Sequence, residues 1–317
     1  MSPLTFAEIN ILVVDDEEII RTLLGDFLEV LGFTNHRLAG DGREAMELLR
    51  ADPPDCLLSD VLMPEMGLID MLPLIRSDHP EMSVIAMSGY SDSDSALELA
   101  RMGANDFLGK PVDLDELERA LRWPLARRAI LDAAERADPE SPCDRVEPVL
   151  FDQAKQCGAR LFRHSARVAR LAQTLDTGLD PATRTDLILA ALTHEIGAGR
   201  RIDLFAEQSR RLGMNEIAMM RGHYPLTARA VARRLGRPAI EPMIARHSVA
   251  SADDPPGTTC LGLLNIVDGC LSDRGDRPAL GVDRVRDILD DRYTPTDPVC
   301  LDRLLAQWSI IESLYTQ

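Results

Sequence analysis

Five polar residues in the first third of the sequence each end or follow a short apolar run. Asp15 and Asp16 follow ILVV, Asp60 ends DCLLSD, Ser88 ends SVIAMS, and Lys110 follows DFLG. Three carboxylates brought to one point repel each other, and Mg²⁺, which prefers hard oxygen ligands, would relieve that repulsion. One carboxylate could then attack a phosphoryl group while the metal and the lysine offset the charge on its oxygens.

A second group of candidate residues lies after residue 150, on segments with helical spacing. His164 shares an apolar stripe of RLFRHSARVARLAQTL, His194 and Glu195 follow the apolar run DLILAALT, and Asp268 shares a stripe of LGLLNIVDGCL. Three helices thus direct ligand-type groups into an aliphatic core. A buried carboxylate is costly unless it is paired or binds a metal. Imidazole and carboxylate together suit Zn, Mn, Fe or Ni, so the pattern indicates a metal site.

The elements that position the first group alternate between strands and helices. Apolar runs before Asp15 and through Asp60, Ser88 and residue 109 predict buried strands, and a further strand–helix unit covers about residues 35–50. This alternation predicts a doubly wound α/β domain with a five-stranded parallel sheet. In such sheets, functional residues collect beyond the carboxyl ends of the strands.

From residue 149 the strand signals disappear, and we predict an all-α bundle. Asp180 as a cap and Pro181 at the first helical position mark the start of one of its helices. We therefore expect a first domain over 1–122, a helical linker over 123–148 and a second domain over 149–317. The linker can be a signalling helix, half of a dimer contact or a solvated spacer, and a homodimer is an open alternative.

Composition limits the classes of partner. The net charge is −17, with 52 acidic against 35 basic residues, which argues against DNA because phosphate binding needs a clustered positive surface. No apolar run reaches the ~18 residues of a membrane span, and the N-terminus lacks signal-peptide features. Six scattered cysteines without a CxxC pair are expected to be reduced thiols in a cytoplasmic protein.

Residues 8–122 closely resemble the receiver domain of two-component response regulators. The resemblance implies a sensor histidine kinase or another phosphodonor as partner, and a cis peptide at Lys110–Pro111. Next to Asp60, Gly67 directly follows Met66, one residue earlier than in the family pattern. The implied roles are phosphoacceptor for Asp60, Mg²⁺ ligands for Asp15, Asp16, Asp60 and the carbonyl of Leu62, switch pair for Ser88 and Phe107, and phosphate contact for Lys110.

The order of histidines and carboxylates after residue 150 resembles the HD superfamily of metal-dependent phosphohydrolases. His223 and His247 resemble the HD-GYP branch, whose members hydrolyse cyclic di-GMP and often follow a receiver domain. The resemblance implies one or two transition metals. It assigns His164, His194, Glu195 and Asp268 to a primary site, and His223, His247 and a bridging Glu195 to a second.

Several positions depart from the HD-GYP pattern. Glu195 replaces the aspartate of the His-Asp doublet, Ala198 replaces a lysine, Ser248 replaces the second histidine of a pair, and Arg160 replaces an acidic residue. Residues 249–267 are too few to hold the GYP loop. These losses would slow hydrolysis severely.

Three functions follow for the second domain. The favoured one is a catalytically inactive binding module, for cyclic di-GMP or a protein partner, controlled by phosphorylation of Asp60. The second is an active metal-dependent phosphodiesterase acting on cyclic di-GMP or another nucleotide. The third is a structural bundle in which the histidines and carboxylates only form hydrogen bonds.

Overall fold

The computed structural model describes residues 6–89, 93–199, 213, 221–250, 253–273, 278–292 and 298–315. The chain divides into two compact units, the first mainly of residues 1–129 and the second mainly of residues 130–317. Within the described ranges, no helix is both long enough and apolar enough to span a membrane.

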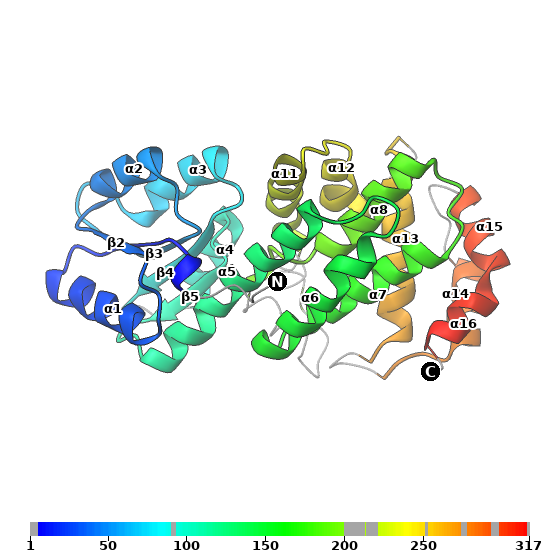
Figure 1. Cartoon of the computed structure of the whole chain (residues 1–317). Coiled ribbons are helices and arrows are strands. Elements are labelled where there is room, and N and C mark those ends of the chain that lie inside the picture. Colours follow the sequence, from blue (N-terminus) through cyan, green and yellow to red (C-terminus); the bar gives the residue numbers. More distant parts are fainter. Residues whose placement is uncertain are drawn as a thin grey trace. The chain divides into compact units, whose positions relative to one another are not determined.

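A five-stranded parallel sheet forms the centre of the first unit. Its strand order is β2-β1-β3-β4-β5, which confirms the predicted doubly wound fold (Figure 1). The register pairs Val14 with Ser59, and Asp60 with Met87, so the carboxyl ends of the central strands meet at one edge. The strands are β1 (Ile11–Val14), β2 (His36–Ala39), β3 (Cys56–Asp60), β4 (Ser83–Ser88) and β5 (Asp106–Gly109).

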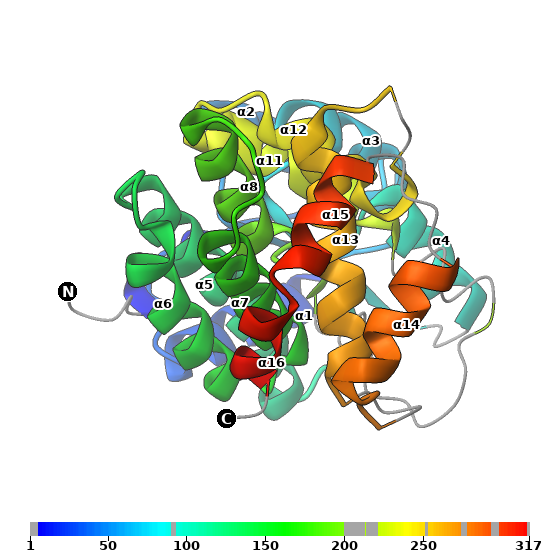
Figure 2. The same ribbon diagram turned by 90° about the vertical axis from the view of Figure 1, so that its right-hand side faces the viewer.

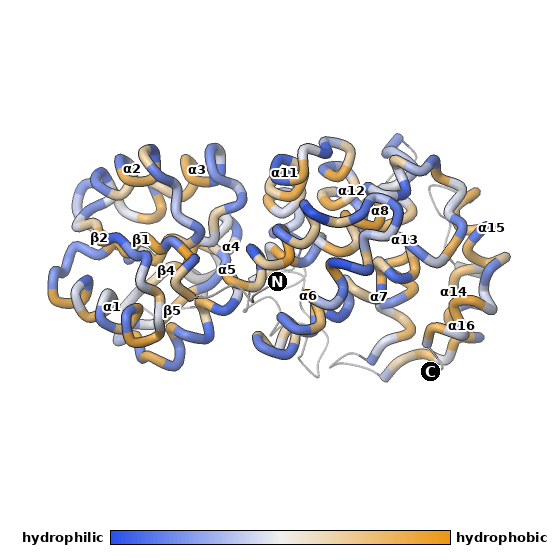
Figure 3. The backbone as a smooth tube through the Cα atoms, in the orientation of Figure 1, coloured by the Kyte–Doolittle hydropathy of each residue, from blue (hydrophilic) through white to orange (hydrophobic). Residues whose placement is uncertain are grey.

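Helices cover both faces of this sheet because alternate strand residues point to opposite sides. Leu12 and Val14 pack in a core with residues of α2, α3 and α4, while Ile11 and Val13 pack with residues of α1 and α5. Figure 3 shows the hydrophobic residues of β1 and β4 in the middle of this arrangement. The helices are α1 (Glu18–Val30), α2 (Gly42–Ala51), α3 (Leu68–Asp78), α4 (Ser93–Met102) and α5 (Leu114–Glu135), preceded by a 3-10 turn at Phe6–Glu8.

The second unit consists of helices in its described residues, as predicted. Asp180 caps α8 by accepting hydrogen bonds from the backbone of Ala182 and Thr183. Helix α13 packs against α7, α8, α12, α14 and α15, and Figure 2 shows it among them. The helices are α6 (Pro142–Cys157), α7 (Arg160–Thr174), α8 (Pro181–Thr193), α11 (Tyr224–Leu235), α12 (Ile240–Arg246), α13 (Pro256–Leu271), α14 (Val282–Arg292), α15 (Pro298–Ala306) and α16 (Trp308–Tyr315), with a 3-10 turn at His247–Val249.

The segment predicted as a linker is mostly helical. Helix α5 continues through Pro124 to Glu135, and α6 begins at Pro142 and continues through Pro148. Proline at the first helical position costs no hydrogen bond, since that N–H has no partner within the helix. Pro142 and Pro148 therefore both lie within α6.

One cysteine pair differs from the sequence-based expectation. Cys260 of α13 and Cys300 of α15 form a disulfide, with Cα atoms 6.1 Å apart. The expectation that all six cysteines are reduced is wrong for this pair. The two residues are 40 positions apart, and only the packing of α13 against α15 brings them together.

Candidate functional sites

The carboxyl end of the sheet brings the first group of residues together. Asp15 follows β1 and Asp60 ends β3, and Lys110 follows β5. Lys110 Nζ lies 2.8 Å from Asp15 Oδ2 and 2.5 Å from Asp60 Oδ2. Burial alone would lower the pKa of Lys110, but its hydrogen bonds to the two carboxylates raise that pKa above its usual value. The lysine therefore stays charged between two aspartates.

Asp15, Asp16 and Asp60 could hold a cation at this edge. Each offers a carboxylate oxygen, and the three oxygens lie within 4.8 Å of one another. Asp15 is fully buried, Asp60 is 9% exposed and Asp16 is exposed. Three hard oxygen donors at one side of the sheet fit Mg²⁺. Leu62, predicted to add its carbonyl, lies just beyond β3, and its backbone N–H donates to Asp60 Oδ1 at 3.4 Å.

The loop after β3 closes in a tight turn. Glu65 has a positive φ of 64°, which a residue with a side chain rarely adopts. Leu68 N–H donates to Val61 O, closing the loop at 3.2 Å. A Cβ on Gly67 would lie 2.7 Å from Val61 O, so a glycine is required there.

Ser88 and Phe107, the predicted switch pair, are both buried at 6% exposure. Ser88 ends β4 and its carbonyl accepts a hydrogen bond from Lys110 N–H at 2.8 Å. The peptide between Lys110 and Pro111 is cis, as predicted.

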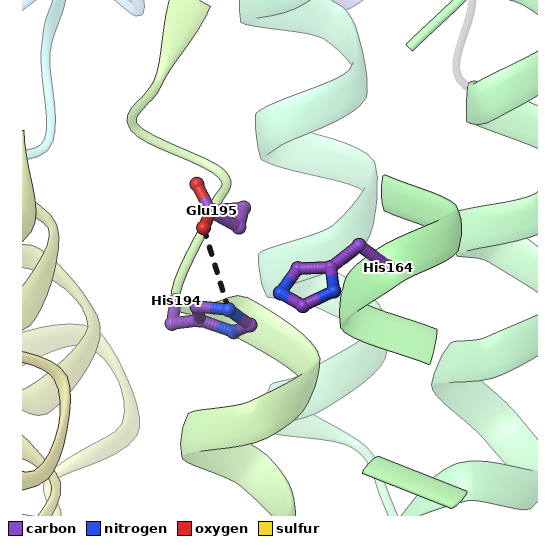
Figure 4. Close-up of side chains that lie close together, drawn as sticks. All are labelled: His164, His194 and Glu195. Atoms are coloured by element: carbon purple, nitrogen blue, oxygen red, sulfur yellow. Dashed lines mark ion pairs between the residues drawn. The ribbon is translucent and has the colours of Figure 1, made fainter. Parts of the chain in front are cut away.

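The second group of residues converges inside the helical unit. His194 Nε2 lies 3.4 Å from Glu195 Oε1, and His223 Nε2 lies 3.1 Å from Glu195 Oε2. Ring centroids are 5.3 Å apart for His164 and His194, and 5.4 Å apart for His194 and His247. Figure 4 shows His164 on one helix, His194 at the end of another, and Glu195 on the segment that follows His194. We call these five residues the histidine cluster: His164, His194, Glu195, His223 and His247.

Hydrogen bonds fix which nitrogen of two histidines is available. His194 Nδ1 donates to Ala191 O at 2.8 Å and His247 Nδ1 donates to Ile244 O at 2.9 Å. Their Nε2 atoms are buried and have no hydrogen-bond partner among the described residues. Metal-binding histidines commonly have this arrangement, with one nitrogen bonded to a carbonyl and the other bare. The orphaned buried nitrogens therefore fit a metal ion.

Burial and charge keep His194, His247 and Glu195 in the protonation states that metal binding needs. Burial lowers the pKa of His194 to about 3 and that of His247 to about 4. Burial alone would raise the pKa of Glu195, but a hydrogen bond with His223 and the neighbouring imidazoles lower it below its usual value. The imidazoles of His194 and His247 are therefore neutral beside an ionised Glu195 carboxylate at neutral pH.

Asp268 on α13 lies at the edge of this group and is engaged by other residues. Arg167 Nε lies 2.6 Å from its Oδ1 and Arg167 Nη2 lies 3.0 Å from its Oδ2. His164 Nδ1 lies 2.5 Å from Oδ2, and the Tyr315 hydroxyl donates to Oδ1 at 2.6 Å. Burial alone would raise the pKa of Asp268, but His164 and Arg167 lower it.

Further residues contribute that were missed from the sequence, among them Tyr224, Arg167 and Tyr315. Tyr224 donates its hydroxyl to Glu195 Oε1 at 3.1 Å, and its ring lies against His247, with centroids 4.5 Å apart. Arg167 stands three positions after His164, on the same side of α7, which was a usable signal. Tyr315 lies 47 positions from Asp268, and no spacing pattern indicates it.

Comparisons with known proteins match a different family to each of the two units. A family model described as "Response regulator receiver domain" matches residues 11–122, and one described as "HD domain" matches residues 161–271. Regulatory protein AtoC of Escherichia coli K12 is 40% identical over 125 residues, covering 38% of this chain and 27% of its own length. Transcriptional regulatory protein ZraR of Escherichia coli O157:H7 is 40% identical over 130 residues, covering 41% of this chain and 29% of its own length.

The chain thus spans less than a third of the length of these two relatives. A solved response regulator receiver domain protein from Clostridium thermocellum is 29% identical, with a TM-score of 0.37 over 39% of this chain and 98% of its own. The fold, the strand-end residues and the family matches together identify a response regulator receiver domain followed by an HD domain, a receiver joined to a phosphohydrolase-like output domain.

Proposed function

We propose that phosphorylation of Asp60 controls a degenerate HD-GYP-like output domain in cyclic di-GMP-type signalling, and that this domain acts by binding rather than by efficient catalysis. The main support for phosphorylation of Asp60 is Lys110, whose ammonium lies between Asp15 and Asp60 at the carboxyl end of the sheet. A sensor histidine kinase or a small phosphodonor would supply the phosphoryl group. The partner of the output domain would be cyclic di-GMP or a protein.

The receiver residues have distinct roles in this proposal. Asp60 attacks the phosphoryl group, and Lys110 neutralises the charge on the transferred oxygens. Mg²⁺, held by Asp15, Asp16, Asp60 and the carbonyl of Leu62, supplies further charge neutralisation when bound. Ser88 and Phe107 transmit the change: both are buried, and Ser88 directly follows Met87, the residue that pairs with Asp60 in the sheet.

Intact-mass measurement with acetyl phosphate and Mg²⁺ tests the receiver assignment. The native chain should gain about 80 Da, the mass of one phosphoryl group. The variant Asp60→Ala should gain nothing. Asp26→Ala, a change at an exposed aspartate of α1, is the matched control and should gain the same mass as the native chain. An equal adduct on Asp60→Ala would refute the assignment.

The output domain lacks groups that phosphodiester hydrolysis uses. Ala198 offers no cation to the phosphate, Ser248 offers no second imidazole, and Arg160 replaces a carboxylate. Each lost preorganised charge contact costs about a hundredfold in rate, and such losses are not additive. We therefore expect cyclic di-GMP turnover at least ~10³-fold below that of a complete site.

The alternative is an active metal-dependent phosphodiesterase, and the bare imidazole nitrogens of the cluster favour it. A bound divalent ion would supply an activated water and neutralise phosphate charge. Turnover of cyclic di-GMP by Mn²⁺-loaded protein separates the two functions. Brisk hydrolysis that His194→Ala abolishes would establish the enzyme, while absent hydrolysis with retained cyclic di-GMP binding supports the binding module.

A further inference from the structure

We propose that Asp268 positions His164 instead of binding a metal ion itself, so that the histidine cluster holds one divalent ion per chain. This inference rests on the proposed function, because it concerns the metal site of the output domain. It departs from the sequence resemblance, which assigns Asp268 to the metal ligands.

The oxygens of Asp268 are already fully used. Arg167 donates to both of them, Tyr315 and Ser272 donate to Oδ1, and His164 Nδ1 contacts Oδ2. A carboxylate has about four lone-pair positions, and these residues supply five donors. A metal ion could bind Asp268 only by displacing some of them.

Displacement would be costly because of charge. Asp268 is 1% exposed, and the Arg167 guanidinium neutralises it through two hydrogen bonds, one to each carboxylate oxygen. Removing the carboxylate from that pair would leave a guanidinium without its partner at a half-buried position. Arg167 therefore occupies, as a built-in cation, the place at Asp268 where a metal ion of the primary site would bring its charge. Glu195 is then the one carboxylate left among the five residues of the histidine cluster, and a single carboxylate does not offset the charge of two divalent ions in a buried site.

The remaining residues still form a centre for one ion. His164, His194 and Glu195 each offer a ligand atom, and these atoms lie within 4.8 Å of one another. With His164 Nδ1 directed at Asp268, its Nε2 is the nitrogen left for a metal, and it now lies 2.5 Å from Asn265 Oδ1. A carboxylate that holds the second nitrogen of a ligating histidine is a common orienting partner.

Zinc counting on the full chain tests the inference. The protein is loaded with Zn²⁺, freed of excess metal and analysed for zinc per chain. We expect one zinc in the native chain, one in Asp268→Asn and none in His194→Ala. Because an orienting partner typically contributes 10–100-fold to metal affinity, Asp268→Asn should lose about that factor in a chelator competition.

A matched control separates positioning from general destabilisation. Asp186 is a buried aspartate of α8 paired with Arg237 at 2.6 Å, so Asp186→Asn also breaks a buried ion pair. It should keep the native zinc affinity. In Co²⁺-loaded protein, the ligand-field absorption bands should keep their positions in Asp268→Asn, since its coordinating atoms are unchanged.

Two zinc ions in the native chain would overturn the inference, and this count needs no variant to fold. Loss of zinc from Asp268→Asn, shifted Co²⁺ bands, or an equal loss of affinity in Asp186→Asn would also overturn it. None of these outcomes affects the proposed phosphorylation of Asp60. A native chain that binds no zinc would overturn both the inference and the metal site of the output domain.

Discussion

Replacing Arg167 by leucine should destabilise the helical unit by about 3 kcal/mol. The change removes two charge-assisted hydrogen bonds, each worth ~1.5–3 kcal/mol, from a carboxylate that is 1% exposed. Breaking a buried ion pair by removing one partner costs about 3–5 kcal/mol. The lower end applies because the Arg167 side chain is 38% exposed, and because His164 and Tyr315 still contact the carboxylate.

Differential scanning calorimetry of the full chain measures this effect, with Arg303→Leu as the matched control. Arg303 pairs with Asp176 at 2.7 Å, but the Asp176 side chain is 70% exposed, so that pair contributes at most about 1 kcal/mol. At ~2–4 °C per kcal/mol for a unit of this size, Arg167→Leu should lower the unfolding temperature of the second unit by about 6–12 °C. The control should lower it by less than about 4 °C. Equal shifts would show that burial of Asp268 is not what makes its ion pair strong.

The ion pair between Arg167 and Asp268 also predicts how acid changes the stability of the helical unit. The pKa of Asp268 is lowered in the folded protein, so its stabilisation is present above its unfolded pKa of ~3.9 and is lost as the pH falls below that value. Without Arg167, the folded pKa is lowered less. The variant should therefore lose less stability than the native chain between about pH 4 and pH 2. A steeper acid loss in the variant would contradict this sign.

Three further outcomes are expected. Gly262→Ala should lower the stability and the zinc content of the protein more than Gly257→Ala does. The new Cβ would lie 2.4 Å from the His247 backbone carbonyl oxygen in the first variant, but 2.4 Å from the flexible end of a methionine side chain in the second. Equal losses by calorimetry and metal analysis would contradict this prediction. Metal-free protein should lose stability as the pH falls from about 6.5 toward 5, by roughly 1.4 kcal/mol per pH unit for each of His194 and His247. The reason is that their folded pKa values of about 3 and 4 lie below the unfolded value. Urea-unfolding free energies that do not change with pH would refute this. Lys110→Ala should slow labelling by acetyl phosphate about 10²-fold, and an unchanged rate by intact mass would count against its role.

The sequence by itself determined the receiver-type fold and the place of its polar residues. Each of Asp15, Asp60, Ser88 and Lys110 ends or follows an apolar strand. Because all strands of a parallel sheet end at the same edge, their order along the chain hardly matters for bringing these side chains together. The helix start at Asp180 could also be predicted from the local sequence, since a cap depends only on the next few backbone N–H groups.

Tertiary structure alone decided the partners of Asp268. Helical spacing correctly places this residue on a buried face, but a buried carboxylate can be held by a metal or by a cation from another helix. Arg167 comes from α7 and Tyr315 from α16. Only the packing of these helices against α13 distinguishes an ion pair from a metal ligand at this position.

The disulfide and the contact of Tyr224 with the histidine cluster also depend on tertiary packing. Cys260 meets Cys300 across 40 positions, and Tyr224 reaches Glu195 across 29. Periodicity reports which face of a helix is buried, whereas the choice of neighbour on that face is made by how helices pack in three dimensions. Contacts between residues far apart in the chain therefore required the structure.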